Sequence, residues 1–448
     1  MLNKPKDQTQ GSLFFSLEST LNQKHPMYIL ANKVNWQLFE DSFSSLYCLD
    51  NGRPAKPIRL MVGLLILKHL RNISDESVVE QWSENNYYQY FCGEEVFQPC
   101  EPCEASELVH FRNRIGESGI ELILKESIRI NGNDSNDSTA SIDTTVQEKN
   151  ITFPTDSKLH RKIIDKCRKI AEKENLPLRQ SYTRTLKRLS LDQRFRNHPR
   201  NKWKARKADR KEKTIAGRLV RELERNLLPN SQYQSDIDLF KRILNQKKSD
   251  SHKIYSVHEP EVQCISKGKE HKKYEFGNKV SIIYTQTTGV IIGAMGFRNP
   301  YDGHTIEPAL EQSERLLGKR TIKTLIGDRG YKGKRKINET TIEIPKPFNN
   351  RKQSQYQQNK LKKQFRRRAA IEPINGHLKT DHRLNRNFYK GITGDNINVM
   401  LAAAAYNFKR MMNKWKSSFW LQFKLLYEIL IIQWFTQNKI QLKNKWAF

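Results

Sequence analysis

Cysteine and long apolar runs are both scarce in this chain, and each shortage excludes a class of protein. Six cysteines among 448 residues are too few for a disulfide framework, which predicts a reducing compartment. The most apolar stretch, residues 419–435, is interrupted by Gln and charged residues, whereas a bilayer-spanning helix needs about 20 mostly apolar residues. The first 20 residues contain no apolar run of signal-peptide length. We therefore expect a cytoplasmic protein that is neither secreted nor inserted in a membrane.

Three small-molecule or metal signatures are also missing. No P-loop and no dinucleotide-binding glycine motif occurs, so neither ATP nor NAD is indicated. Cys100 and Cys103 have the spacing of half a zinc site, but no second cysteine pair follows at a suitable distance. His69 and His110 lie in apolar helical segments, and we expect both to be packing residues.

Positive charge, in contrast, is abundant. The 79 Lys and Arg exceed the 48 Asp and Glu and give a net charge of +31, which indicates a polyanionic partner such as nucleic acid. Hydrophobic residues make up only 37% of the chain, but aromatic residues reach 10%, and disordered chains have few aromatics. The composition therefore predicts a folded protein with a wide basic surface.

After an N-terminal tail (residues 1–25), residues 26–130 have the pattern of a helical domain. Apolar spacing predicts helices over 57–70, from Ser74 through Trp82, from Ser106 through Ile115, and over 120–130. Ser74 and Ser106 are suited to cap their helices. Such short helices are typical of a module that binds DNA ends and equally of an ordinary helical core.

Beyond a polar linker (131–137), β-branched and apolar runs predict a mixed sheet. The expected strands are 139–146, 151–153, 253–257, 274–276, 279–284, 290–295, 322–328 and an edge strand at 342–345. Helices are expected over about 305–317, 354–379 and 395–412. This order describes an α/β domain over 139–412 with flanking helices. The aromatic helical tail (413–448) is either an interface or a helix that covers the core.

A very basic helical stretch interrupts the predicted strands at about residues 157–250. Between Arg184 and Lys213 there are 13 Lys or Arg and 3 acidic residues. Tyr182, Phe195 and Trp203 are interleaved with these cations and could stack on bases or sugars. The pattern fits contact with phosphates, and it also fits a solvated helical face with no ligand.

Two aspartates are the first candidates for chemistry. Asp143 and Asp328 each end a predicted apolar strand, where both carboxylates could point into one site at the sheet edge. Phosphodiester chemistry with two Mg²⁺ ions needs carboxylates that converge from different elements. Taken alone, each aspartate is more simply a turn residue that ends its strand.

A third acid lies on a predicted helix. At about 100° per residue, four side chains fall within roughly 60° of one another: Phe365, Arg368, Glu372 and Lys379. This face would place a carboxylate between two cations that suit DNA phosphates. The plain alternative is a surface helix with an ordinary Arg368–Glu372 salt bridge. Pro373 is expected to kink or restart the helix.

The segment Phe365-x2-Arg368-x3-Glu372-x6-Lys379 resembles the Tyr-x2-Arg-x3-Glu-x6-Lys signature of bacterial insertion-sequence DDE transposases, in the group resembling insertion sequence five. Phenylalanine replaces the tyrosine and removes one hydroxyl. Residues 142–145 and 327–331 resemble the family's segments around its first and second acids. Residues 301–305 resemble the turn before its central helix, where we expect His304 to begin that helix. The resemblance covers about residues 26–410.

The resemblance implies an RNase H-like (retroviral integrase-like) fold in which residues 157–250 are an insertion. Asp143, Asp328 and Glu372 would be the catalytic residues and hold two Mg²⁺ ions, with Mn²⁺ as a substitute. The other two site residues, Arg368 and Lys379, would bind DNA phosphates. The implied reaction is cleavage at the terminal inverted repeats of a mobile element, followed by strand transfer into target DNA. A homodimer on paired double-stranded DNA ends, associated with the nucleoid, is expected.

Two alternatives remain at this point. The first is a nuclease of the same fold that cuts DNA without joining it, because such an enzyme shares the metal site. The second is a DNA-binding protein that has kept the fold but performs no chemistry.

Overall fold

The computed structural model describes residues 16–48, 51–228, 231–266, 273–318, 322–345, 354–368 and 370–416. The chain divides into two compact units. The first contains Met1–Thr145 and Val280–Phe448, and the second contains Val146–Lys279. Most of the predicted N-terminal tail, the apolar stretch 419–435 and nearly all of the predicted C-terminal tail lie outside the described residues.

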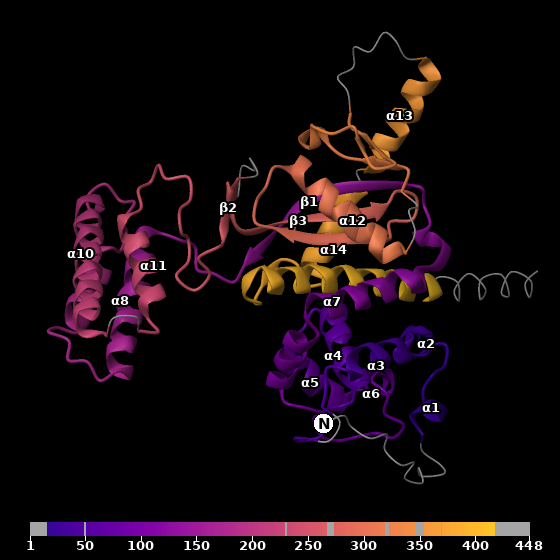
Figure 1. Cartoon of the computed structure of the whole chain (residues 1–448), viewed down its shortest axis with the longest axis horizontal. Helices are drawn as coiled ribbons and strands as arrows, with labels where there is room; N and C mark the ends of the chain where they lie inside the picture. Colours follow the sequence, from indigo (N-terminus) through magenta and orange to yellow (C-terminus); the bar gives the residue numbers. More distant parts are fainter. Residues whose placement is uncertain are drawn as a thin grey trace, which may run out of the picture. The chain divides into compact units, whose positions relative to one another are not determined.

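Among the described residues, seven α-helices precede the sheet; Figure 1 draws them in the indigo-to-purple part of the chain. They are α1 (Leu17–Thr20), α2 (Pro26–Lys33), α3 (Trp36–Ser44), α4 (Ile58–Arg71), α5 (Asp75–Glu84), α6 (Asn86–Phe91) and α7 (Ala105–Asn131). Helix α4 is buried on almost every side, as its near-continuous apolar sequence requires. Ser74 caps α5 as predicted, because its hydroxyl accepts a hydrogen bond from the Ser77 amide at 3.1 Å.

Helix α7 confirms one detail of the sequence prediction and corrects another. It is kinked at Gly116, whose φ of 60° only glycine adopts readily, so the helices predicted over 106–115 and 120–130 are two helical segments on either side of this kink. Its N-cap is Glu104, in a capping box with Glu107, and not Ser106. His110 is exposed on this helix, so its predicted packing role is wrong, whereas His69 is fully buried.

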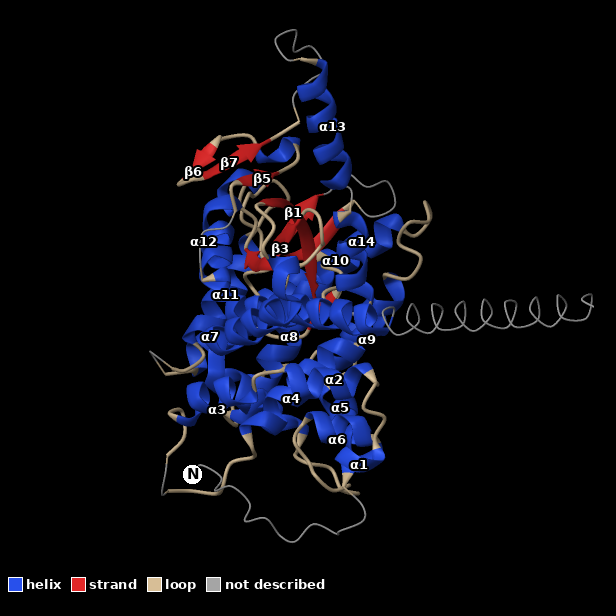
Figure 2. Ribbon diagram, turned by 90° about the vertical axis from the view of Figure 1, so that its right-hand side faces the viewer, coloured by secondary structure: helices blue, strands red, loops and turns tan. Residues whose placement is uncertain are grey.

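Within the described residues the sheet is mixed, with eight strands; strands are red in Figure 2. They are β1 (Thr139–Lys149), β2 (Gln263–Ser266), β3 (Tyr274–Thr285), β4 (Ile291–Phe297), β5 (Thr324–Ile326), β6 (Lys336–Ile337), β7 (Thr340–Glu343) and β8 (Arg386–Asn387). The order is β2-β3-β1-β5-β7-β6, with β4 on β3 and β8 on β1. The β1–β5 and β5–β7 pairs are parallel, and the β2–β3 and β6–β7 pairs are antiparallel.

Three predicted strands differ from the structure. Residues 151–153 form no strand, because Pro154 follows and Thr155 already caps the next helix. Residues 253–257 form none either, since the Gln246 side chain bonds the backbone of Ile254 in place of a neighbouring strand. The predicted edge strand at 342–345 corresponds to β7, which lies inside the sheet between β5 and β6.

Helices cover both faces of the sheet. The short helix η2 (Asp302–Thr305) and α12 (Ile306–Leu317) cover one face, where Ile142, Ile283 and Leu310 share a core. On the other face lie α14 (Ile371–Thr380) and a helix over residues 391–416, which pack against Ile282 and Tyr284. Successive residues of β3 point to opposite faces, as in any strand.

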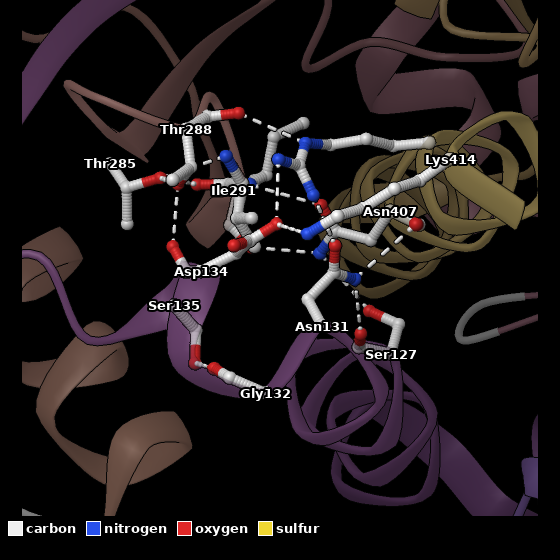
Figure 3. A network of polar contacts seen from close by, with 12 residues as sticks. Ser127, Asn131, Gly132, Asp134, Ser135, Thr285, Thr288, Ile291, Asn407 and Lys414 are labelled. Atoms are coloured by element: carbon white, nitrogen blue, oxygen red, sulfur yellow. Dashed lines mark hydrogen bonds and ion pairs between the residues drawn. The ribbon is translucent and has the colours of Figure 1, made fainter. Parts of the chain in front are cut away.

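The same core continues into the N-terminal helices, which therefore belong to the first unit. Figure 3 shows a polar network that joins the end of α7 to the helix over 391–416. Asn407 bonds the Ser127 hydroxyl and both backbone groups of Ile291. Asp134 forms salt bridges with Arg410 at 2.9 Å and Lys414 at 3.0 Å. The predicted limit of a separate helical domain near residue 130 is not a boundary between compact units.

The second unit contains the predicted basic helical stretch. Its helices are α8 (Asp156–Lys173), α9 (Thr183–Asp192), α10 (Lys202–Asn226) and α11 (Gln234–Asn245). Their apolar faces form a core of their own, with Ile163, Leu219 and Phe240 fully buried. Within the described residues of both units, no helix has the length and apolar character needed to cross a membrane.

Candidate active site

Asp143 and Asp328 follow the paired part of two neighbouring parallel strands. The register pairs Thr139 with Thr324 and Ser141 with Ile326, where β5 ends. If the same register is continued by two residues, Asp143 falls level with Asp328. Adjacent strands lie about 4.8 Å apart, so the backbones of the two aspartates are neighbours at the carboxyl end of β5. β5 ends just before Asp328, as predicted, but β1 continues to Lys149, so the expectation that Asp143 ends its strand is wrong.

The Asp328 side chain is fixed by the turn that follows β5. It caps the short helix η3 (Arg329–Tyr331) and accepts a hydrogen bond from the Gly330 amide at 2.7 Å. A Cβ atom on Gly330 would lie 2.9 Å from Asp328 Oδ1 and 3.1 Å from Asp302 Oδ2. A side chain at position 330 would therefore collide with both carboxylates.

Asp302 is a site residue that the sequence analysis missed. It lies in η2, just before α12, and its Oδ1 accepts a hydrogen bond from the Thr144 hydroxyl at 3.1 Å. Asp302 is thus bonded to the neighbour of Asp143 and adjoins Asp328. Its sequence context, Tyr301-Asp302-Gly303, reads only as a turn. His304, which we expected to begin the helix, lies in the same η2 turn.

Asp143 also contacts two residues from the helices beside the sheet. Its Oδ1 lies 3.8 Å from Arg368 Nη1, and its Oδ2 accepts a hydrogen bond from Asn375 Nδ2 at 3.2 Å. The Asp143 side chain is 19% exposed and that of Arg368 is 28% exposed. The predicted cation Arg368 is therefore next to the first acid, and Asn375 is a second contact that the sequence did not indicate.

Glu372 and Lys379 lie on α14, the helix that carries Asn375. The expected helix over 354–379 is broken into α13 (Gln355–Arg368) and α14, and Pro373 lies in the first turn of α14, as its chemistry predicts. Residues three or four apart on a helix have Cβ atoms about 5–6 Å apart. Glu372 therefore precedes Asn375 by about one turn, and Lys379 follows it by about one turn.

The Glu372 side chain is exposed. It makes no hydrogen bond or salt bridge within the described part of the chain, so the structure does not join it to Asp143 or Asp328. Asp143, Arg368 and Asp328 are brought together, whereas Glu372 and Lys379 are placed nearby through the helix that carries Asn375.

The pKa values of two buried tyrosines are raised in part by the negative charge of the nearby aspartates. Burial raises the pKa of Tyr331 well above its usual value, and repulsion from Asp143, Asp302 and Asp328 raises it further. Burial likewise raises the pKa of Tyr284 to about 12, with a contribution from Asp143. Both phenols stay protonated near neutral pH. Tyr284 donates a hydrogen bond to the Arg368 carbonyl at 2.9 Å, which holds the end of α13 at the site.

The oxygen atoms at this site are of the chemical type that binds a hard divalent cation. Carboxylate and amide oxygens are the ligands that Mg²⁺ accepts, and the buried Asn375 Oδ1 has no hydrogen-bond partner among the described residues. However, no three Asp, Glu, His or Cys side chains in the described ranges are already arranged to hold a metal ion. The exposed Glu372 side chain would have to turn toward Asp143 to complete such a set.

Comparison with known proteins identifies the class. A family model described as a transposase domain (DUF772) matches residues 15–114, and a second, described as a transposase DDE domain, matches residues 244–408. The second range contains Asp302, Asp328, Arg368, Glu372 and Lys379. Asp143 lies outside both ranges and is joined to the others through the pairing of β1 with β5.

A relative from Rhizobium meliloti, described as uncharacterized protein ORF8 in the nfe locus, is 42% identical over 189 residues, which cover 41% of this chain and 91% of the relative. No solved structure matches the chain. Together with the two family models, this similarity shows that the chain belongs to the DDE transposases of bacterial insertion sequences.

Proposed function

We propose that this transposase cleaves phosphodiester bonds at the ends of its mobile element and joins the freed 3′ end to target DNA. Asp143, Asp328 and Glu372 are its catalytic acids on an RNase H-like sheet, and Arg368 and Lys379 bind phosphates. The proposal includes two Mg²⁺ ions, for which Mn²⁺ could substitute, and a homodimer on two double-stranded DNA ends. The observation that supports the proposal is the parallel pairing of β1 with β5, the two strands whose chain segments carry Asp143 and Asp328.

In this proposal the acidic and basic residues of the site have different roles. Asp143 supplies oxygen ligands from β1, Asp328 supplies them from the turn after β5, and Glu372 supplies a carboxylate from the first turn of α14. Arg368 neutralises Asp143 in the structure at 3.8 Å and is positioned to exchange that partner for a phosphate. Bound divalent ions would activate the attacking oxygen and stabilise the leaving oxygen.

The test measures cleavage and strand transfer on duplex DNA with the element's terminal repeats and Mg²⁺. We expect Asp143→Asn, Asp328→Asn and Glu372→Gln each to lower the cleavage rate by about 10³-fold, because metal ions contribute several kcal/mol and each 1.36 kcal/mol is a factor of ten. DNA binding should persist in all three variants. Glu339→Gln, which changes an exposed acid away from the site, is the matched control.

Two results would contradict the proposal. Cleavage that survives in the Asp143 and Asp328 variants would exclude these acids from the chemistry. Cleavage without any joined product on a supercoiled target would instead identify a nuclease.

A further inference from the structure

The second unit carries more than its share of the positive charge of the chain. Residues 146–279 contain 35 Lys and Arg but only 17 Asp and Glu. This excess of 18 is more than half of the net charge of +31. The acids proposed for catalysis all belong to the first unit, so this charge serves another purpose.

Two of the three acids where the cations are densest are buried or neutralised. Glu212 is fully buried and is bonded to Arg161 and Ser157. Asp209 forms a salt bridge with Arg196 at 2.6 Å. Of the 13 Lys and Arg between residues 184 and 213, all except Arg196 are exposed. The surface there is consequently more positive than the composition alone indicates.

Helix α10 orders part of this charge into a stripe. One face of the helix packs on the core of the unit through Ala208, Ile215 and Leu219. The opposite face carries seven exposed residues spaced three or four apart, with no acid among them: Trp203, Lys207, Arg210, Thr214, Arg218, Arg221 and Arg225. None of its five cations forms a salt bridge within the described residues. We call these seven residues the α10 stripe.

The dimensions of the stripe match those of a DNA duplex. It extends over 22 steps of the helix, or about 33 Å at 1.5 Å per residue, and one turn of B-DNA is about 34–36 Å long. Trp203, whose side chain is 60% exposed, stands at one end, where an indole can pack against a sugar or base. An exposed tryptophan side chain leaves a large apolar surface in water, which is unfavourable unless a ligand covers it.

We infer that the α10 stripe is a docking surface for the sugar–phosphate backbone of duplex DNA, independent of base sequence. The identity of the polyanion rests on the proposed function. Lys and Arg contacts to phosphates position a duplex but carry no sequence information. The second unit therefore holds DNA that the first unit cleaves or joins, without selecting which DNA it is.

The test compares two variants of the full-length chain that lose the same charge. The stripe variant carries Lys207→Gln, Arg210→Gln, Arg218→Gln and Arg221→Gln. The control variant carries Lys169→Gln, Arg242→Gln, Lys247→Gln and Lys248→Gln, which are exposed positions of the same unit outside α10. Binding to a duplex of about 30 base pairs of arbitrary sequence is measured at several salt concentrations, where each phosphate contact contributes about 0.9 to the salt slope.

We expect the stripe variant to lower the slope of log K against log salt by about 3–4 and the affinity at 0.1 M salt by about 100-fold or more. The control variant should change the slope by less than about 1, and Arg210→Gln alone should lower it by about 1. Equal losses in the two fourfold variants, or no loss in the stripe variant, would overturn the inference. A wild-type chain that binds no duplex at all would overturn the proposed function as well, so the two failures are distinguishable.

Discussion

Asp302 is held by groups that belong to the acidic site. The Thr144 hydroxyl donates to it at 3.1 Å, and Thr144 follows Asp143 in β1. Asp302 and Asp328 both crowd the Gly330 backbone, and both raise the pKa of the buried Tyr331, for which burial itself is the larger cause. A fourth carboxylate is therefore bonded to β1 at the residue that follows Asp143.

We predict that Asp302→Asn lowers the DNA cleavage rate by about 10–100-fold, the usual effect of removing a residue that orients metal ligands. Asparagine keeps the shape but removes the charge. Half-maximal activity should also require more Mg²⁺, which a purely structural defect would not cause. The measurement is the cleavage rate against Mg²⁺ concentration, with Glu339→Gln as control. An unchanged rate and Mg²⁺ requirement would show that Asp302 is only a turn residue.

At this scale, the sequence predicted that two apolar strands carry Asp143 and Asp328, and the structure pairs these strands in parallel. The expected strand end holds for Asp328 but not for Asp143, because β1 continues to Lys149. Asp302 and Asn375 could not be found this way, because a turn and a helix place them through contacts with residues far along the chain, such as Thr144 and Asp143. No local pattern specifies those contacts.

Among the helices, α4 contains a buried titratable group whose charge folding suppresses. Burial lowers the pKa of His69 to about 3, with a further contribution from Lys68. Its ring lies between Asn398 Oδ1 at 3.2 Å and the Leu65 carbonyl at 3.3 Å. The neutral ring thus joins α4 to the helix over 391–416.

The lowered pKa of His69 is expected to make the free energy of unfolding depend on pH. Unfolded His69 titrates near 6.5, so between pH 6.5 and about 3 the unfolded state binds a proton that the folded state excludes. The contribution of His69 to the free energy of unfolding is fully present above pH 6.5. It decreases on acidification by about 1.4 kcal/mol per pH unit. We expect His69→Gln to remove that contribution from the slope measured by urea unfolding between pH 4.5 and 6.

His110→Gln is the matched control, because His110 is exposed and its replacement should leave the slope as in the wild-type chain. An identical pH dependence in the His69→Gln and wild-type proteins would show that the proton binds the folded state after all.

Element types were largely predictable, whereas their ends and partners were not. Apolar periodicity gave α4, α5 and α12, and Pro373 gave the break between α13 and α14. The strand predicted at 253–257 failed because the Gln246 side chain satisfies the Ile254 backbone. A run of β-branched residues in the sequence does not reveal whether its backbone will hydrogen-bond to a neighbouring strand or to a side chain.

For the molecule as a whole, the sequence pattern distinguishes the basic insertion, and the structure groups the rest of the chain into one compact unit. Charge and helical pattern distinguished residues 157–250, which lie within the second unit. The union of the N-terminal helices with the sheet depends on contacts such as Asn407 with Ser127, 280 residues apart, and composition does not report them.

Two separate hydrophobic cores predict two unfolding transitions. Phe240 is fully buried in the core of the second unit, and Phe408 is fully buried in the core of the first. Truncating either ring should cost about 3–5 kcal/mol of the free energy of unfolding. We expect Phe240→Ala to lower the melting temperature of one calorimetric transition and Phe408→Ala to lower that of the other.

Each variant serves as the control for its counterpart, because the same ring is removed from a fully buried site in both. Urea unfolding followed by tryptophan fluorescence identifies the transition of the first unit, where Trp82 is fully buried, and the other transition is then assigned to the second unit. A single transition that shifts equally in both variants would mean that the two cores unfold as one. The insertion would then be an extension of the catalytic core, and removing its apolar contacts would destabilise the acidic site directly.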